Sequence, residues 1–344
     1  MSVQLVSPLI SPIYADTSCG VQQIQPKKIL SIWIVTLTDY ASQCHKFLLD
    51  GGRHVSVSTH ADVVDIVSQI HQDKERTSLH QQVSRQLGGG CPNTHNSVNG
   101  SLNLCSRLLI MTSIGEPPLG TDGPNTIRWD TGTLRDFTDS YFGPANSGVQ
   151  LHPDNAQIGR IFTALNLTKI GGMRIEWTRN LADHLRLVDD DNTVSIFDCV
   201  GFLKFQRTVR KQLFPPGFID ETLRTLALLL PQNDTRTQGW IATQVEAHEL
   251  DPQLAECGSL NTHARRFENF SYWNNRLVVL KQALDEARPQ TLSQWWHDRR
   301  NGVQWYTFWV AILVFLVTIV FGLVQSVEGA LQVYLSWQAL RQAG

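Results

Sequence analysis

Three residues in the middle of the sequence have side chains that could together perform nucleophilic catalysis: His184, Asp198 and Cys199. An imidazole can take the proton of a thiol, and a carboxylate can orient that imidazole. The three residues flank two expected strands, so they are near one another in the chain. The alternative is structural: Cys199 ends the strand VSIFDC, and His184 lies on the surface of the helix LADHLRL. Because such sites are recognised by geometry, the sequence leaves catalysis open and favours a protein that is not an enzyme.

Acidic residues and histidines elsewhere lack the spacing of a metal site. The run Asp189–Asn192 has neither the alternating ligands nor the central Gly of a calcium loop. His60 and His248 each stand near one acidic residue, but neither belongs to an HExxH zinc motif. The run Gly88–Gly90 is not followed by the Lys and hydroxyl residue of a phosphate-binding loop. We therefore expect no metal and no cofactor.

The composition is that of a globular chain with no drive toward nucleic acid. Of 344 residues, 42% are hydrophobic and 17% are charged, and the formal net charge is −2. A charge this small gives no general attraction to phosphate backbones, so we expect no nucleic-acid partner. The six Cys form no CxxC pair, which fits reduced thiols in the cytosol. Sequons at Asn99, Asn166, Asn233 and Asn269 would then stay unmodified.

The strongest pattern is a membrane span near the end of the sequence. Trp305–Val324 is a run of twenty residues without a charge. At about 1.5 Å per residue it covers roughly 30 Å, the thickness of a bilayer's hydrocarbon core. Aromatic and basic side chains prefer the two interfaces, so the sequence predicts the following interfacial anchors: Trp295, Trp296, Arg299, Arg300, Trp305, Trp309, Tyr334 and Trp337.

Basic residues beside the span predict its orientation. Arg288, Arg299 and Arg300 precede it, and only Arg341 follows it. The positive-inside rule then keeps the large N-terminal part in the cytosol and places the short tail in a lumen. Residues 1–20 show no signal peptide. We expect a tail-anchored, single-pass protein with the bilayer as partner, and we favour the endoplasmic reticulum.

Small residues in the span suggest self-association. Gly322, Ser326 and Ala330 recur at every fourth position, a strip that lets two helix backbones approach. A homo-oligomer through this helix is therefore expected. Glu328 lies beside the strip and is either an intramembrane carboxylate with a function or a group in the far headgroup region.

We expect an α+β fold: a predominantly helical cytosolic domain with a few short strands, and one C-terminal transmembrane helix. The expected segments are a disordered arm at 1–28, a helical part with long loops at 29–150, an α+β unit at 151–262, juxtamembrane helices at 263–304, the transmembrane helix at 305–324 and an interfacial tail at 325–344.

Apolar spacing and cap residues predict the finer elements. Thr59 caps a helix with Val63, Ile66 and Ile70 inward, whereas 88–101 is expected to be a loop. The remaining expectations are a helix from Pro153 through Leu165, strands at 173–177 and 194–196, a short helix 181–187 capped by Asn180, helices at 199–213, 219–230 and 267–287, and irregular chain at 232–262.

Several segments resemble a group of uncharacterised membrane-anchored proteins of filamentous fungi. They are WYTFWVAILVFLVTIVFGLVQSVEGALQVY, NLADHLRL with TVSIFD, FIDETLRTLALLLPQ and RLVVLKQALDEARP. The resemblance covers roughly residues 100–335. It implies a lineage and a one-span architecture, and it implies no activity.

We therefore expect an interaction or scaffold module at an endomembrane, whose protein partner the sequence does not name. The alternative is a membrane-associated accessory enzyme or tailoring protein of a fungal secondary-metabolite pathway. A deep pocket lined by convergent polar groups would favour the enzyme. An exposed apolar patch or groove would favour the scaffold.

Overall fold

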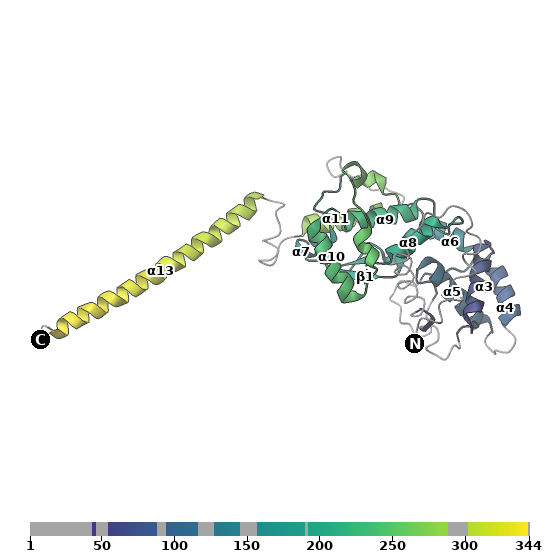
Figure 1. Cartoon of the computed structure of the whole chain (residues 1–344), viewed down its shortest axis with the longest axis horizontal. Helices are drawn as coiled ribbons and strands as arrows, with labels where there is room; N and C mark the ends of the chain where they lie inside the picture. Colours follow the sequence, from purple (N-terminus) through teal and green to yellow (C-terminus); the bar gives the residue numbers. More distant parts are fainter. Residues whose placement is uncertain are drawn as a thin grey trace. The chain divides into compact units, whose positions relative to one another are not determined.

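The computed structural model describes residues 43–45, 54–87, 94–115, 127–144, 157–189, 192–287 and 302–342. Their contacts form a globular unit, drawn from 1–168 and 173–286, and a second unit that contains the C-terminal helix and 169–172 (Figure 1). The arm expected at 1–28, the juxtamembrane stretch 288–301 with its four predicted anchors, and the glycines 88–90 lie outside the described residues.

Helices α3 (His60–His71), α4 (Arg76–Leu87), α5 (Thr94–Ile110) and α6 (Leu134–Tyr141) form the N-terminal part of the globular unit. The predicted cap of α3 is confirmed: the Thr59 side chain accepts the Asp62 backbone N–H, and Asp62 accepts the Thr59 N–H in return. The same reciprocal cap, made by Thr133 and Asp136, begins α6.

The prediction of a loop at 88–101 is wrong from residue 94, where α5 begins. Small residues of this run face inward, because the chain at 54–57 lies directly against them. The Ser101 hydroxyl accepts the backbone N–H of Ser56 at 2.7 Å. A Cβ on Gly100 would stand 1.8 Å from the His54 carbonyl oxygen, so only glycine fits there. Packing therefore makes a helix from a composition that is typical of loops.

The sheet contains β1 (Arg174–Thr178), β2 (Arg186–Val188) and β3 (Thr193–Phe197) in the order β1-β3-β2. β3 pairs parallel with β1 and antiparallel with β2. All five residues of β3 are buried, as expected for a central strand. Both predicted strands are confirmed.

The prediction of a helix at 181–187 is wrong beyond the first turn. Asn180 does cap, but only the 3-10 turn η2 (Leu181–Asp183) follows. Leu185 then takes a left-handed conformation, φ 59°, and its N–H bonds to Ser195. The chain reverses there and continues as β2, because pairing with β3 outweighs the helical spacing of the leucines.

Two further expectations are corrected around the sheet. The start of the helix expected from Pro153 lies outside the described residues, and from residue 157 the helix is only α7 (Ala164–Lys169), since Ile158 instead bonds through its backbone to Arg265. The irregular region at 232–262 contains α10 (Thr235–His248), η3 (Pro252–Glu256) and the bend between them. α10 buries only Thr237 and Ile241, so it shows no apolar stripe that the sequence could reveal.

The predicted helices after β3 are present, with shifted ends. α8 (Val200–Thr208) is shorter than expected, and α9 (Phe218–Leu229) follows the predicted Pro-Pro-Gly break. The short turns η4 (His263–Arg265) and η5 (Phe267–Asn269) precede α11 (Asn274–Glu286), which buries Leu277, Leu280 and Leu284 as expected.

A buried carboxylate joins α9 to the chain before α11. Glu221 is 2% exposed and accepts the backbone N–H groups of Ser271, Tyr272 and Trp273, each at 2.8 Å. The Trp273 indole donates to the Thr222 hydroxyl at 2.9 Å. These bonds close an aromatic cluster made of Phe142, Phe214, Phe218, Tyr272 and Trp273.

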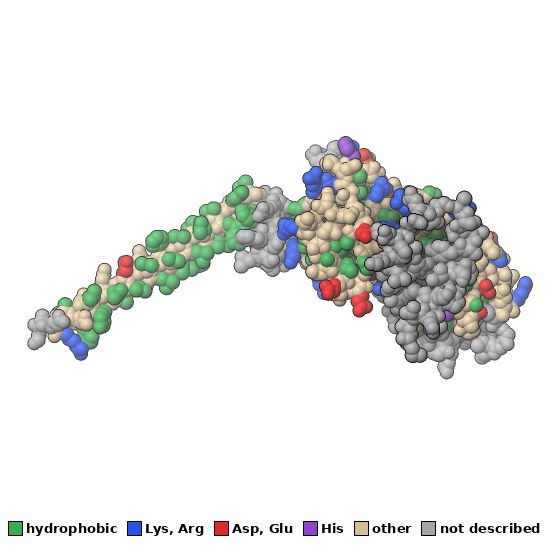
Figure 2. Space-filling model, in the orientation of Figure 1, with side chains coloured by type: hydrophobic (Ala, Val, Ile, Leu, Met, Phe, Trp, Pro, Cys, Tyr) green, Lys and Arg blue, Asp and Glu red, His purple; other side chains and the backbone are tan. Residues whose placement is uncertain are grey.

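The C-terminal helix α13 (Gly302–Gln342) is continuous over 41 residues. Its apolar stretch, Trp305–Ala339, is 35 residues long, and none of its apolar window is buried among the described residues. Figure 2 shows hydrophobic side chains along the whole helix. At about 1.5 Å per residue the stretch measures about 52 Å, longer than a bilayer core. The fold is therefore α+β with one helix able to span a membrane, and the predicted tail at 325–342 continues that helix without a break.

Replacing Glu221 with Ala should destabilise the globular unit by at least about 3 kcal/mol, because three backbone N–H groups lose a charged acceptor. The matched control is Asp220→Ala, which removes an exposed ion pair with Arg207 and a first-turn charge of α9, and should cost about 1 kcal/mol. Denaturant unfolding of the purified chain in detergent, followed by tryptophan fluorescence, measures both. Equal losses in the two variants would contradict the role assigned to Glu221.

Candidate functional site

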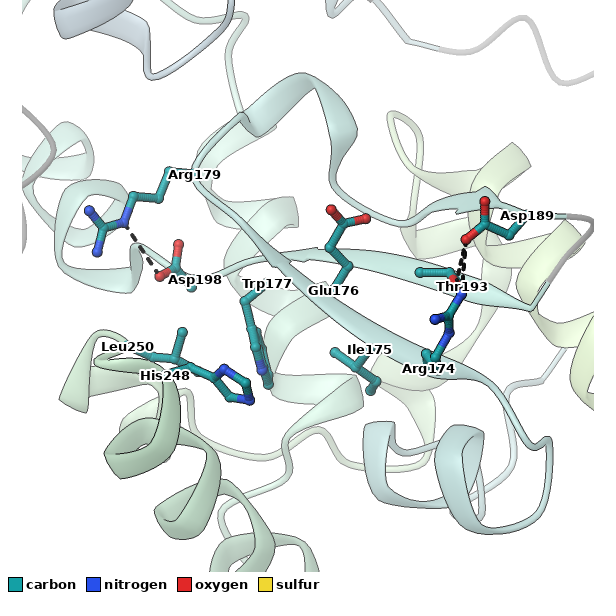
Figure 3. A pocket seen from close by; sticks show the side chains of 10 residues that line it. All are labelled: Arg174, Ile175, Glu176, Trp177, Arg179, Asp189, Thr193, Asp198, His248 and Leu250. Carbon is teal, nitrogen blue, oxygen red and sulfur yellow. Dashed lines mark hydrogen bonds and ion pairs between the residues drawn. The ribbon is translucent and has the colours of Figure 1, made fainter. Parts of the chain in front are cut away.

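The described part of the globular unit has an open hollow of about 680 Å³ along strand β1. Ten side chains line it, from β1, from the ends of β2 and β3, and from the end of α10 (Figure 3): Arg174, Ile175, Glu176, Trp177, Arg179, Asp189, Thr193, Asp198, His248 and Leu250. Successive residues of β1 point to opposite faces. Figure 3 shows Glu176 on one side of the strand and Ile175 and Trp177 on the other.

Arg179 and Asp198 form an ion pair at one end of the hollow. Each residue directly follows a strand, β1 or β3, and the carboxyl ends of parallel strands meet at one edge of a sheet. The Arg179 Nε lies 3.8 Å from the Asp198 Oδ2. The Asp198 side chain is nearly fully buried, whereas about a third of Arg179 is exposed. Burial raises the pKa of Asp198 to about 6, although Arg179 and the Cys199 thiol act in the opposite direction.

A second ion pair closes the other end of the hollow. The Arg174 Nη2 lies 3.1 Å from the Asp189 Oδ2, which also accepts the Thr193 hydroxyl at 3.1 Å. Both charged side chains are more than half exposed, so their attraction is screened by water and adds little stability. Glu176 accepts the Ser195 hydroxyl at 3.4 Å.

The end of α10 forms the wall on the Trp177 side. Trp177 and Trp240 rings lie 6.2 Å apart, and the Trp177 indole donates to the Gln244 amide oxygen at 3.5 Å. His248 follows on the same helix face. The sequence analysis missed this wall because it expected irregular chain there. The signal was present in the spacing of residues 240, 244 and 248, each four positions apart.

His184 has a structural role that the sequence analysis did not foresee. It is fully buried, so the surface interpretation is wrong. Its Nδ1 accepts the Phe197 N–H at 3.2 Å, and its Nε2 lies 2.7 Å from the Thr225 hydroxyl. Thr225 gives its own proton to the Thr222 carbonyl, so it accepts the Nε2 proton of a neutral imidazole. Burial, with Arg276 nearby, lowers the pKa of His184 to about 3.

The expected nucleophilic set is therefore not assembled around His184. Both ring nitrogens are already bonded, to Phe197 and Thr225, so neither can accept the proton of Cys199. The Cys199 thiol is buried and donates to the Asp198 Oδ1 at 3.4 Å. Within the described ranges, no group of three His, Cys, Asp or Glu side chains could hold a metal ion.

The predicted membrane residues that the structure describes all lie on α13. Trp305 and Trp309 have ring centroids 6.2 Å apart, one turn from each other. Gly322, Ser326 and Ala330 lie on the continuous helix, and Arg341 stacks over the Trp337 ring at 4.2 Å. Tyr334 is exposed.

No family model, curated protein or solved structure matches the chain. The resemblance to the fungal membrane proteins therefore stays a prediction, and what the chain does must be argued from its own residues.

The pKa of Asp198 makes a prediction about stability. Between about pH 4 and 6 the folded chain holds this proton and the unfolded chain releases it, so stability is lost as pH rises through that range. The variant Asp198→Asn lacks the effect. Relative to the wild type, the free energy of unfolding of this variant should increase by about 1.4 kcal/mol for each unit that pH rises over the same range. Denaturant unfolding at several pH values measures the difference, and parallel profiles would contradict it.

Proposed function

We propose that this chain is an interaction module held at an endomembrane by α13, with its globular unit in the cytosol and its C-terminus in the lumen. The observation that carries the proposal is the apolar stretch Trp305–Ala339, of which no part of the apolar window is buried in the described molecule. Water disfavours so large an apolar surface, and the hydrocarbon core of a bilayer is a solvent that a helix of this length can cross.

Binding rather than catalysis is supported by the state of the charged groups. His184, the base of the expected nucleophilic set, has both ring nitrogens occupied inside the core. The hollow along β1 is open, and its arginines are paired with carboxylates at both ends. The large apolar side chains exposed on the described globular unit are only Tyr141, Ile161 and Val279, so we assign recognition to the hollow along β1.

Residues around α13 support the orientation and the self-association in the proposal. Arg341 is the one basic residue in the last turn of the helix, whereas three arginines precede the helix in the sequence. The small residues Gly322, Ser326 and Ala330 give a second copy of α13 a face for close approach. The endoplasmic reticulum is the membrane we favour.

A second candidate function is a membrane-associated accessory enzyme or tailoring protein of a fungal secondary-metabolite pathway. One observation favours it: Asp198, with a raised pKa, lies beside Arg179 at the hollow, and perturbed carboxyl groups in a concave site are typical of acid–base chemistry. The variant Asp198→Asn separates the candidates. It would abolish an enzyme's activity and leave an interaction module bound to its partner.

Charges placed inside α13 should release the chain from membranes. The double variant Phe315→Arg with Leu316→Arg puts two guanidinium groups into the span, at about 2.5–3.5 kcal/mol each near a bilayer centre. Flotation of cell membranes should find this variant in the soluble or aggregated fraction. Val279→Arg, at an exposed position on α11, is the control and should float like the wild type. A double variant that still floats would overturn the anchor.

Orientation is tested by adding a glycosylation acceptor after Gly344 and treating intact microsomes with protease. We expect a glycosylated C-terminus and a digested globular unit. An unmodified C-terminus with a protected globular unit would place that unit in the lumen and overturn the proposed cytosolic side. The four native sequons would then become candidate modification sites.

A further inference from the structure

We propose that the outer edge of β1 binds an extended segment of a partner protein, which adds to the sheet as a fourth strand and ends in a carboxylate side chain. The inference rests on the proposed function as an interaction module and assigns it a binding surface. Exposed strand edges bind extended segments through main-chain hydrogen bonds, while alternate side chains give specificity.

The backbone of β1 has the required unpaired groups. The Arg174 N–H bonds to the Asn192 carbonyl at 2.8 Å, and the Thr178 carbonyl accepts the Asp198 N–H at 3.1 Å. Bonding residues alternate along a strand, so residues 174, 176 and 178 face β3. Ile175 and Trp177 therefore direct their N–H and C=O groups away from it. Within the described ranges, β3 is the strand that pairs with β1, so this edge is open.

The hollow runs along that same edge and gives room to a strand. Its lining includes Arg174 through Trp177 in succession, which are side chains of both faces of β1 (Figure 3). An added strand would place alternate side chains on these two faces. On one face they would meet Trp177 and Leu250, which suit an apolar residue. On the other they would meet Glu176.

Arg179 explains why we expect a carboxylate at the end of the segment. Its Nε faces Asp198 at 3.8 Å, and the structure gives its Nη1 and Nη2 no partner among the described residues. A guanidinium presents these nitrogens as a fork that binds a carboxylate through two hydrogen bonds. Arg179 directly follows β1 and lines the same hollow as the edge residues of β1. We therefore place a carboxylate of the segment in this hollow, beyond the end of β1, opposite the guanidinium.

The test uses the full-length chain in detergent and fluorescent peptides with alternating Thr and Val that end in Glu. Two further versions of the peptide carry N-methyl groups at alternate residues: one version at the odd-numbered positions and the other at the even-numbered positions. In an added strand only every second N–H group faces β1, and only those groups are needed for pairing. Methylation of that set should therefore lower the affinity at least tenfold, whereas methylation of the other set should leave the affinity unchanged. Equal binding of both versions, or no binding of any peptide at about 1 mM, would overturn strand addition.

Variants test the edge and the carboxylate separately. Ile175→Pro removes an outward N–H that β3 does not use, and should weaken binding at least tenfold. The peptide that ends in Gln should bind at least tenfold more weakly than the Glu peptide. Arg179→Gln should abolish that preference, whereas Arg207→Gln, at an exposed arginine on α8, should keep it. A preference that survives in Arg179→Gln would overturn the assigned role of this arginine.

Two controls keep the outcomes distinct. If the wild type forms a dimer that Ile175→Pro dissolves, the edge pairs with a second copy and the partner-protein proposal fails. The N-methylated peptides act on the wild type, so the test remains decisive if Ile175→Pro does not fold. If the peptides do not bind while the chain still floats with membranes, the strand-addition proposal is wrong and the proposed membrane anchor still stands.

Discussion

The carboxylate of Glu221 is the constraint on which the globular unit depends. An ionised group that is 2% exposed is tolerated only where hydrogen bonds replace its water, and three consecutive N–H groups of residues 271–273 do so. The same helix, α9, offers Thr222 to the Trp273 indole and Thr225 to His184. His184 in turn accepts the N–H of Phe197, the last residue of β3. A chain of bonds thus connects α11, α9 and the sheet, and it fixes where Asp198 lies at the hollow.

Much of the fold could be predicted from sequence where one local signal and the packing agree. The Thr59 cap, the alternation of β1, the Pro-Pro-Gly break before α9 and the leucines of α11 are such cases. Predictions failed where packing overrides the local signal. Gly100 and Ser101 are typical of a loop, yet they lie in α5 because the chain at residue 54 must approach closely. α10 contributes only two buried residues, so it has no apolar stripe that would predict a helix, and its sequence signal is limited to the four-residue spacing of residues 240, 244 and 248.

The candidate site was less predictable than the fold, for a physical reason. The sequence does identify the residues that end β1 and β3, and Asp198 does lie at the hollow beside Cys199. Whether His184 can act as a base depends on which atoms its two ring nitrogens form hydrogen bonds with. Those atoms belong to Thr225 and Phe197, which are 41 and 13 positions away in the sequence. Spacing carries no information about such contacts. The edge of β1 is similar, since only the strand order leaves it open.

α13 is longer than the hydrocarbon core of a bilayer is thick. Its candidate span of 35 residues measures about 52 Å, whereas a hydrocarbon core is about 30 Å thick. Transmembrane helices tilt by at most about 40°, which brings roughly 39 Å, or about 26 residues, into the core. In a bilayer that α13 spans, the remaining turns would project from the core as a continuation of the same helix. A thicker membrane would take in more of those turns, so the free energy of insertion would depend on membrane thickness.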